Sequence, residues 1–208
     1  MYGTATIYFM SRSLILLQEF AQKLSKAQQS LAARHLMCLA AAKLLETSPE
    51  DFCIDDENTP PRLKRLDHSP VPLNFSISHR KTWVGCLTST SPRIGFDLEI
   101  HTSRDFSSLL EDVLNAEEKA ALICPDSNLE TLFYRCWTAK EALGKLHGHG
   151  WSSSPLDLDL VIAAQNPAIH CAQHEWPTHQ LTCAYAIQSS FETLFSPPEI
   201  LFIGMTSV

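Results

Sequence analysis

Two carboxylates stand two residues apart in an otherwise apolar segment, Gly95-Phe96-Asp97-Leu98-Glu99. If this segment is a strand, Asp97 and Glu99 project from one face while Phe96 and Leu98 project from the other. Adjacent carboxylates repel each other unless a cation lies between them, and Mg²⁺ prefers oxygen ligands of this kind. The spacing therefore indicates a divalent-cation site, with an acidic, solvent-facing edge strand as the alternative.

A second group of side chains recurs at a spacing of four residues. Trp137, Glu141 and Lys145 share one face if the segment around them is a helix. On a surface, such a Glu–Lys pair adds only about 0.2–0.5 kcal/mol of helix support. Phe133 lies on the same stripe, which indicates that this face turns inward. A carboxylate and an ammonium on an inward face need partners such as a metal ion or a phosphate.

The charges divide unevenly along the chain, although the net charge is −7. Residues 1–96 carry a formal charge of +3 and residues 97–208 a charge of −10. This division suits a site where carboxylates hold a cation and basic side chains hold phosphates, with chance segregation of surface charge as the alternative. An acidic chain argues against a nucleic-acid or anionic-membrane binder, so neither is expected as a partner.

The elements that would position these residues are helices mixed with strands. A chain of 208 residues, 45% hydrophobic and 19% charged, is a folded globular protein of one domain or two small lobes. We predict helices over Lys26–Leu45, Phe106–Leu114, Ala116–Ile123 and Leu129–His147, the last ended by Gly148 and Gly150. We predict strands over Thr4–Met10, Phe75–Ser78, Trp83–Thr88, Arg93–Glu99, Asp157–Ala163, Ile169–His174, Leu181–Gln188 and Ile200–Met205. Asp51–Pro72 is proline-rich and predicts an irregular connection. The class is α+β or α/β, with two lobes joined near residue 93.

The seven cysteines include no C-x-x-C pair, which is typical of reduced thiols in a cytoplasmic protein. The apolar run Leu14–Leu17 is too short for a signal peptide, and no apolar stretch approaches the 18 or so residues of a membrane span. His170 and His174 could share a Zn²⁺ ion, but scattered surface histidines are the commoner explanation.

Three blocks in this order resemble the 4′-phosphopantetheinyl transferases of the surfactin-synthetase-activating (Sfp) type. They are Asn74-Phe75-Ser76-Ile77-Ser78-His79, then Ile94-Gly95-Phe96-Asp97-Leu98-Glu99, then a W-x-x-K-E-x-x-x-K signature at Trp137, Lys140, Glu141 and Lys145. Leu31–Leu36, which contains Arg34, is a looser match to a helical Gly-Arg segment of the family. The similarity covers about residues 31–150, and the short length resembles the compact bacterial holo-acyl-carrier-protein synthases. The chain departs from the family at Arg80, where Ser is frequent, and in lacking a Gly-Lys-Pro segment.

The resemblance implies two similar α/β lobes related by a pseudo-two-fold axis, residues 1–92 and 93–208, with coenzyme A in the cleft between them. Asp97, Glu99 and Glu141 would hold Mg²⁺, and Ser78, His79 and Arg34 would meet coenzyme A phosphates. Arg62 or Lys64 would replace the lysine of the Gly-Lys-Pro segment. Glu141 and Lys145 would be catalytic, with Lys145 also on a phosphate, and Glu118 or Glu117 resembles a further acidic position of the second lobe.

The implied reaction moves 4′-phosphopantetheine from coenzyme A to a serine of an apo acyl or peptidyl carrier protein and releases 3′,5′-ADP. We expect a Mg²⁺-dependent, monomeric, cytoplasmic enzyme of fatty-acid or polyketide biosynthesis. Two alternatives stay open. One is a non-catalytic homologue that only binds carrier proteins, and the other is a different Mg²⁺-dependent phosphoanhydride enzyme that uses water as the nucleophile.

Overall fold

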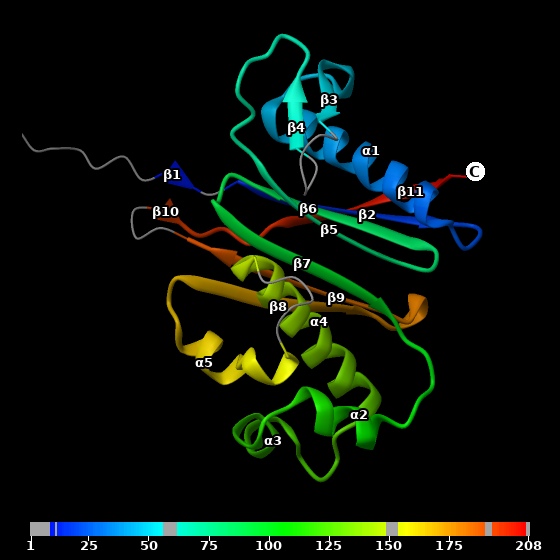
Figure 1. Ribbon diagram of the computed structural model, residues 1–208, viewed down its shortest axis with the longest axis vertical. Helices are drawn as coiled ribbons and strands as arrows, with labels where there is room; N and C mark the ends of the chain where they lie inside the picture. Colours follow the sequence, from blue (N-terminus) through cyan, green and yellow to red (C-terminus); the bar gives the residue numbers. More distant parts are fainter. Residues whose placement is uncertain (1–8, 11, 56–61, 149–153, 190–192, 207–208) are drawn as a thin grey trace, which may run out of the picture.

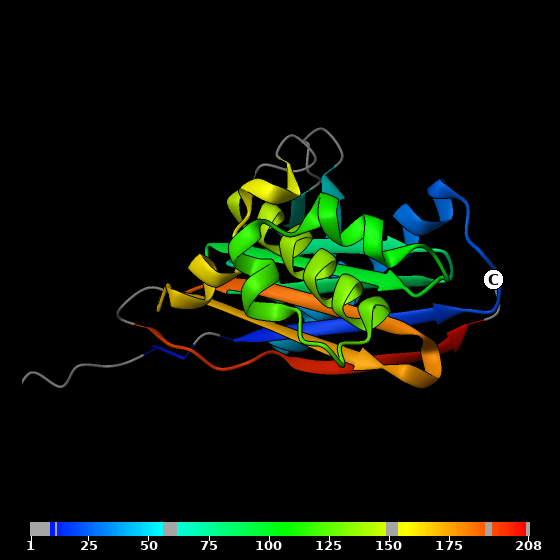
Figure 2. The ribbon, with the colours of Figure 1, turned by 90° about the horizontal axis from the view of Figure 1, so that it is seen from below.

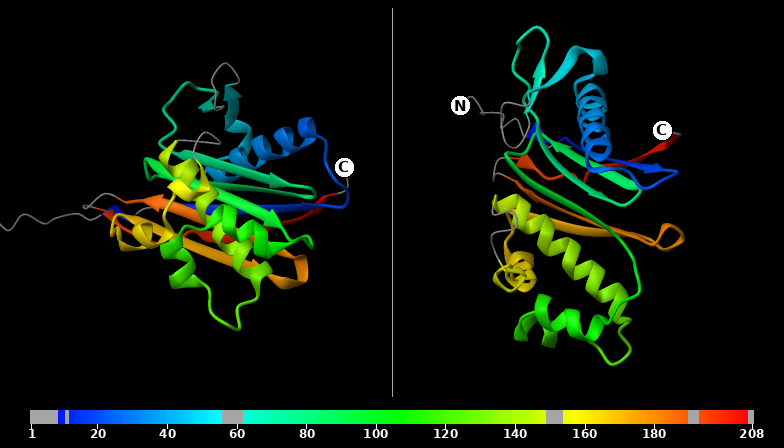
Figure 3. Two further views of the ribbon diagram at one scale, coloured as in Figure 1. Left: turned by 60° about the horizontal axis from the view of Figure 1, so that its bottom comes forward. Right: turned by 45° about the vertical axis from the view of Figure 1, so that its right-hand side comes forward.

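The computed structural model describes residues 9–10, 12–55, 62–148, 154–189 and 193–206. The fold is mixed α+β, as predicted, and is built in four layers. Helix α1 (Lys26–Leu45) covers a four-stranded sheet, and α4 (Leu129–His147) covers a three-stranded sheet. Figures 1 and 3 show the two helices on opposite outer sides with both sheets between them.

The two sheets contain most of the strands. The first has the order β11-β2-β6-β5, formed by Glu199–Thr206, Ser13–Phe20, Trp83–Ser89 and Asn74–Arg80. The second has the order β7-β9-β8, formed by Arg93–Ile100, Leu181–Gln188 and Ile169–Trp176. The remaining elements are the pair β1 (Phe9–Met10) and β10 (Thr193–Leu194), the hairpin β3 (Phe52–Asp55) and β4 (Arg62–Arg65), and the helices α2 (Phe106–Val113), α3 (Ala116–Leu122) and α5 (Leu160–Gln165).

Strand β2 is buried on both faces because it lies between α1 and the second sheet. Leu14 and Leu16 pack in the α1 core, whereas Ile15 and Leu17 pack against β7 and β9. A strand covered on both sides reads as a continuous apolar run without alternation. The sequence prediction noted the run Leu14–Leu17 but did not recognise it as a strand.

Helix α1 has the predicted bounds because its first residues form a capping box. The amide of Gln28 donates to Ser25 Oγ at 3.3 Å, and the amide of Ser25 donates to Gln28 Oε1 at 2.9 Å. This cap fixes where the chain enters the helix, beside the turn between β5 and β6. There the Leu24 amide donates to the Lys81 carbonyl at 3.3 Å.

Helix α4 lies directly on β7 because residue 95 is glycine. A Cβ added at Gly95 would lie 1.8 Å from the Ala142 carbonyl oxygen, so any larger residue would push the helix away from the strand. Seen from below in Figure 2, the yellow-green α4 runs across the strands. The helix ends at His147, as predicted, with Gly148 in the left-handed conformation at φ 75°. Gly150 lies outside the described residues.

Two predictions about secondary structure are wrong. Asp157–Ala163 is not a strand but a short 3₁₀ helix at Pro155–Asp157 followed by α5. Asp159 caps α5 by accepting from the amides of Val161 and Ile162 at 2.8 and 2.9 Å, which favours a helix over a strand. Asp51–Pro72 is not wholly irregular, because β3 and β4 pair antiparallel within it. The other predicted helices and strands are present, although of Thr4–Met10 only Phe9–Met10 lies within the described residues.

The last strand returns to the first sheet. β11 pairs parallel with β2, so residues 199–206 lie beside residues 14–20 rather than with β7, β8 and β9. The expected division of the chain into 1–92 and 93–208 stays a prediction. No helix within the described part of the chain has both the length and the apolar character needed to cross a membrane.

Candidate active site

A cleft of roughly 810 Å³ opens where the end of β5, the middle of β7 and the inner face of α4 meet the N-terminus of α1. Six of the residues predicted for the site line it together: Ser78, His79, Asp97, Glu99, Glu141 and Lys145. They come from three elements that are distant in sequence. The structure therefore brings the Asp97–Glu99 pattern of the strand and the Glu141–Lys145 pattern of the helix to one cleft.

Asp97 is the centre of the polar contacts in this cleft. Its Oδ1 accepts a hydrogen bond from Lys145 Nζ at 2.9 Å and another from Ser78 Oγ at 2.7 Å. Lys145 Nζ also donates to the Phe96 carbonyl at 2.8 Å, which fixes the ammonium over β7. Asp97 Oδ2 is buried and accepts no hydrogen bond from any described residue. One oxygen of this carboxylate therefore keeps its lone pairs unused.

Glu99 lies beside Asp97 on the same face of β7 and is half-buried. Burial, and after it the charge of Asp97, raise the pKa of Glu99 to about 7. Three groups oppose this shift: Arg80, whose Nε lies 3.0 Å from Glu99 Oε2, the side chain of Trp137, which donates a hydrogen bond, and Arg104. The net upward shift shows that burial and the Asp97 charge together outweigh these three groups.

Glu141 brings a third carboxylate from α4. Burial and the Asp97 charge raise the pKa of Glu141, and the ammonium of Lys145 opposes that shift. Three carboxylates of one cleft thus influence one another electrostatically. Such an arrangement is typical of a site that is completed by a bound cation.

The donor set fits a hard divalent cation. Asp97, Glu99 and Glu141 offer oxygen ligands only, and Asp97 Oδ2 is a buried carboxylate oxygen without a hydrogen-bond donor among the described residues. Within the described ranges, no three His, Cys, Asp or Glu side chains converge closely enough to hold a metal ion as they stand. Two of the three carboxylates are instead paired with cationic side chains, Asp97 with Lys145 and Glu99 with Arg80.

The basic residues of the cleft differ from those predicted at its outer part. Lys23, Lys26 and Lys81 line it, with Arg80. Arg34, Arg62 and Lys64 are not among the residues that line this cleft. Arg34 lies on α1, and Arg62 and Lys64 lie on β4, where Lys64 Nζ is 2.6 Å from Asp55 Oδ2. Lys23 and Lys26 lie on either side of Ser25, the residue that caps α1. Their closeness to a predicted helix start is the sequence signal that could have found them.

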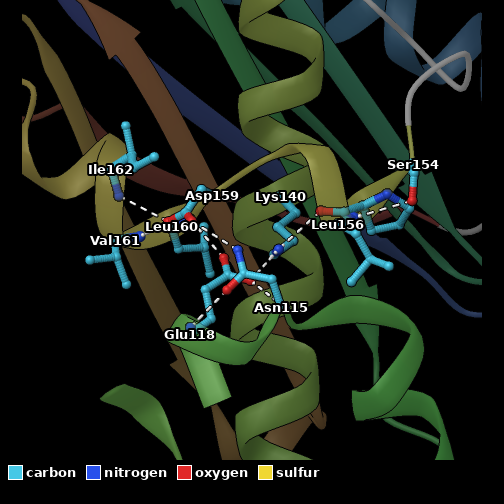
Figure 4. A network of polar contacts seen from close by, with 10 residues as sticks. Asn115, Glu118, Lys140, Ser154, Leu156, Asp159, Leu160, Val161 and Ile162 are labelled. Carbon is cyan, nitrogen blue, oxygen red and sulfur yellow. Dashed lines mark hydrogen bonds and ion pairs between the residues drawn. The ribbon is translucent and has the colours of Figure 1, made fainter. Parts of the chain in front are cut away.

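Glu118, which was expected among the acidic positions of the second half, is fully buried away from this cleft (Figure 4). Its Oε2 lies 2.6 Å from Lys140 Nζ and accepts from the Asn115 amide, while its Oε1 accepts from the Leu160 amide at 2.7 Å. Lys140 Nζ also donates to the Pro155 carbonyl at 2.9 Å. The pair joins α3, α4 and the segment that leads into α5. Glu117 is exposed on α3 and does not line the cleft either.

Comparison with known proteins identifies the family. A family model described as the 4′-phosphopantetheinyl transferase superfamily matches residues 93–196. The 4′-phosphopantetheinyl transferase AcpT of Escherichia coli K12 is 31% identical over 104 residues, which are 49% of this chain and 52% of AcpT. AcpT of Salmonella typhimurium is 33% identical over 97 residues, 45% of this chain and 50% of that protein. The 4′-phosphopantetheinyl transferase HetI of a Nostoc species is 30% identical over 98 residues, 46% and 41% of the two chains.

The matched region spans between about two fifths and about half of the length of these curated relatives. The region covered by the family model contains the four carboxylate and ammonium positions of the cleft on β7 and α4, Asp97, Glu99, Glu141 and Lys145, together with the whole W-x-x-K-E-x-x-x-K signature. The family model itself covers half of the chain. On this evidence, the chain belongs to the 4′-phosphopantetheinyl transferase superfamily.

Proposed function

We propose that the protein transfers 4′-phosphopantetheine from coenzyme A to a serine hydroxyl of an apo carrier protein and releases 3′,5′-ADP, with Mg²⁺ as cofactor. The observation that carries the proposal is the meeting of Asp97, Glu99 and Glu141 with Lys145 and Ser78 in one cleft. Oxygen ligands beside basic donors suit a pyrophosphate that is bound together with a hard cation.

The basic outer part of the cleft would hold the phosphates of coenzyme A. Lys23, Lys26 and Lys81 supply positive charge, and Ser78 and His79 add hydrogen-bonding side chains. The lysines at the start of α1 take the part that sequence reasoning gave to Arg62 or Lys64. Lys23 and Lys26 line the cleft, whereas Arg62 and Lys64 of β4 do not. This difference favours Lys23 and Lys26 as the residues that bind the 3′-phosphate.

The inner part of the cleft would carry the chemistry. Asp97, Glu99 and Glu141 would hold Mg²⁺, which neutralises charge on the pyrophosphate oxygens when it is bound. Lys145 Nζ lies 2.9 Å from Asp97 Oδ1. Its ammonium would stabilise the charge that develops on the departing nucleotide. Phosphoryl-type transfer depends chiefly on such positioning and charge neutralisation.

The transfer itself needs one bond made and one bond broken. The serine oxygen attacks the β-phosphorus of coenzyme A, and the bond from that phosphorus to the bridging oxygen of 3′,5′-ADP breaks. The serine proton goes to Glu141, directly or through a water.

At the level of the whole chain, we propose the two-lobed arrangement of the family, with residues 1–92 and 93–208 as pseudo-symmetric halves and the site between them. The similar placement of α1 on one sheet and α4 on the other supports this view. We also propose a monomer in a reducing compartment such as the cytoplasm, since all seven cysteines are free thiols.

The acceptor would be an acyl or peptidyl carrier protein of fatty-acid or polyketide biosynthesis rather than a nucleic acid or a membrane. Carrier proteins of this kind are acidic, and so is this chain, with a net charge of −7. Docking would therefore depend on a local basic or apolar surface and not on the overall field.

Intact-mass spectrometry tests the proposal. A purified apo-acyl carrier protein is incubated with this protein, coenzyme A and Mg²⁺, and the control is the same carrier with its acceptor serine replaced by alanine. We expect a mass gain of one phosphopantetheine that is lost with the control carrier and on chelation of the metal.

Two other results would contradict the proposal. If coenzyme A binds in calorimetry but no carrier gains mass, the protein is a non-catalytic binding homologue. If coenzyme A is cleaved without any carrier protein, the protein is a phosphoanhydride hydrolase that uses water.

A further inference from the structure

Arg80 lies at a junction between two cavities of the molecule. It is the last residue of β5, directly after His79, and its Nε is 3.0 Å from Glu99 Oε2. Together with Glu99 and Trp137 it lines the cleft described above and also a second pocket of roughly 390 Å³ against α2 and α4. The Arg80 guanidinium therefore borders both cavities while it is paired with the Glu99 carboxylate.

This ion pair occupies a carboxylate that the proposed function needs for a cation. A guanidinium and a divalent cation repel each other when both lie against one carboxylate, so the two compete for Glu99. Breaking the Arg80–Glu99 ion pair also costs little free energy. The Arg80 side chain is 43% exposed, against 16% for Glu99, and a partly exposed ion pair contributes little to stability.

Lys145, the basic residue that pairs with Asp97 of the same cleft, is held differently from Arg80. Its Nζ is tied to Asp97 and also to the backbone carbonyls of Phe96 and Ile77, at 2.8 and 3.4 Å. Its place is thus fixed by the main chain of β5 and β7. Arg80 sits at a strand end with an exposed side chain, so it is the cation that can move.

We propose that Arg80 is an exchangeable counter-ion: it neutralises Glu99 in the empty cleft, and it turns to a donor phosphate when a divalent cation binds that carboxylate. The proposal rests on the proposed function of the cleft. The chemistry suits the exchange, because the planar guanidinium matches a phosphate as well as a carboxylate. The residue before it, His79, lines the same cleft.

The exchange predicts two effects of opposite sign in one variant, Arg80→Ser. Without coenzyme A, the free Glu99 should bind Mn²⁺ about three- to tenfold more tightly, measured by the paramagnetic resonance signal of free Mn²⁺. At saturating Mg²⁺, the same variant should bind coenzyme A about tenfold more weakly in calorimetry, since a charge-assisted hydrogen bond to phosphate is lost. A variant that merely made the cleft less ordered would weaken the binding of both Mn²⁺ and coenzyme A.

Lys81→Ser is the matched control, because it removes one positive charge from the neighbouring residue of the same cleft without touching the Arg80–Glu99 pair. We expect it to change Mn²⁺ affinity less than about twofold. Arg80→Lys keeps the positive charge and loses the planar guanidinium that can bind a phosphate through two hydrogen bonds. This variant should keep near-native Mn²⁺ affinity and should bind coenzyme A more weakly than the native protein.

The exchange is wrong if Arg80→Ser weakens both ligands, if either effect occurs without the other, or if Lys81→Ser tightens Mn²⁺ as much as Arg80→Ser does. Neither titration uses a carrier protein. Opposite shifts together with no mass gain on any carrier would therefore leave the exchange standing and contradict the transferase proposal.

Discussion

Asp97 shares one carboxylate oxygen between an ammonium and a hydroxyl, while its other oxygen accepts no hydrogen bond from the described residues. Asp97→Asn keeps the shape and the acceptor towards Lys145 but removes the charge. We expect transfer to fall at least about a hundredfold, because the change removes electrostatic stabilisation at the reacting phosphate. We also expect the thermal stabilisation by Mg²⁺ to disappear, as measured by a melting scan with and without the metal.

Glu175→Gln is the control for this change. Glu175 Oε1 lies 3.6 Å from Arg135 Nε, and neither residue lines the cleft. It should leave both the transfer rate and the response to Mg²⁺ as they are. A fully active Asp97→Asn protein, or one that still melts higher with Mg²⁺, would remove Asp97 from the cation site.

At the scale of single residues, the sequence predicts the inner part of the cleft and misses the outer part. Asp97 and Glu99, and likewise Glu141 and Lys145, follow the periods of a strand and a helix, so local spacing is enough to group them. Lys23 and Lys26 reach the cleft only because the start of α1 is bonded to the turn after β5. That contact joins residues more than fifty positions apart, and no local pattern encodes it.

Gly95 determines how closely α4 approaches β7. Gly95→Ala would place a Cβ against the backbone oxygen of Ala142, which cannot yield without moving the helix and its Glu141 and Lys145. We expect a loss of unfolding free energy of about 3 kcal/mol or more, at the upper end for overpacking, together with a marked loss of transfer activity. Urea unfolding and the mass assay measure the two effects.

Gly85→Ala is a useful comparison because its added Cβ would meet only side-chain ends, those of Phe96, Leu98 and Leu17. Side chains adjust more easily than backbone, so we expect a smaller stability loss of about 1–3 kcal/mol and better retained activity. Equal losses in the two variants would show that close approach of α4 to β7 is not what residue 95 provides.

The Glu118–Lys140 pair holds three elements together at full burial. Lys140→Met leaves a buried carboxylate without its cation and should cost about 3–5 kcal/mol of unfolding free energy. In the double variant Glu118→Gln/Lys140→Met no charge is left buried at this place, and the cost is one hydrogen bond, from either the Asn115 or the Leu160 amide. The double variant should therefore be more stable than Lys140→Met alone.

Lys119→Met controls for loss of a lysine, since Lys119 forms a surface pair with Glu111, and it should cost less than about 1 kcal/mol. Denaturant unfolding of the native protein, the single variants Glu118→Gln and Lys140→Met, and the double variant closes the cycle. A double variant less stable than Lys140→Met would mean that Glu118 acts through the Asn115 and Leu160 amides alone, independently of the lysine.

At the scale of elements, the sequence predicts what its own periods and caps determine. The Ser25 capping box and the glycine after His147 give the bounds of α1 and α4. β2 is missed because burial on both faces removes its alternation, and that burial comes from partners far along the chain. Residues 157–163 alternate like a strand, but the Asp159 cap turns them into a helix.

The molecule as a whole is a sandwich of two sheets, and two histidines of its edge strand β8 contribute a pH dependence to its stability. His170 stacks on Phe195 with ring centroids 3.7 Å apart, and His174 stacks against Trp176 and Tyr185. Burial lowers the pKa of both histidines below their usual value near 6.5. The described residues hold no metal-binding group of three side chains there or elsewhere, so these contacts define their surroundings.

The sign of the effect follows from this lowered pKa. Below about pH 6.5 the unfolded chain takes up protons at these histidines before the folded protein does, so the unfolding free energy falls as the pH falls through that value. The double variant His170→Gln/His174→Gln lacks the two groups, and its unfolding free energy should depend less on pH between 7 and 5. Urea titrations at several pH values in EDTA measure the slope. His35→Gln, which replaces an exposed histidine on α1, should keep the native slope; a double variant with an unchanged slope would show that the acid sensitivity of the sandwich arises elsewhere.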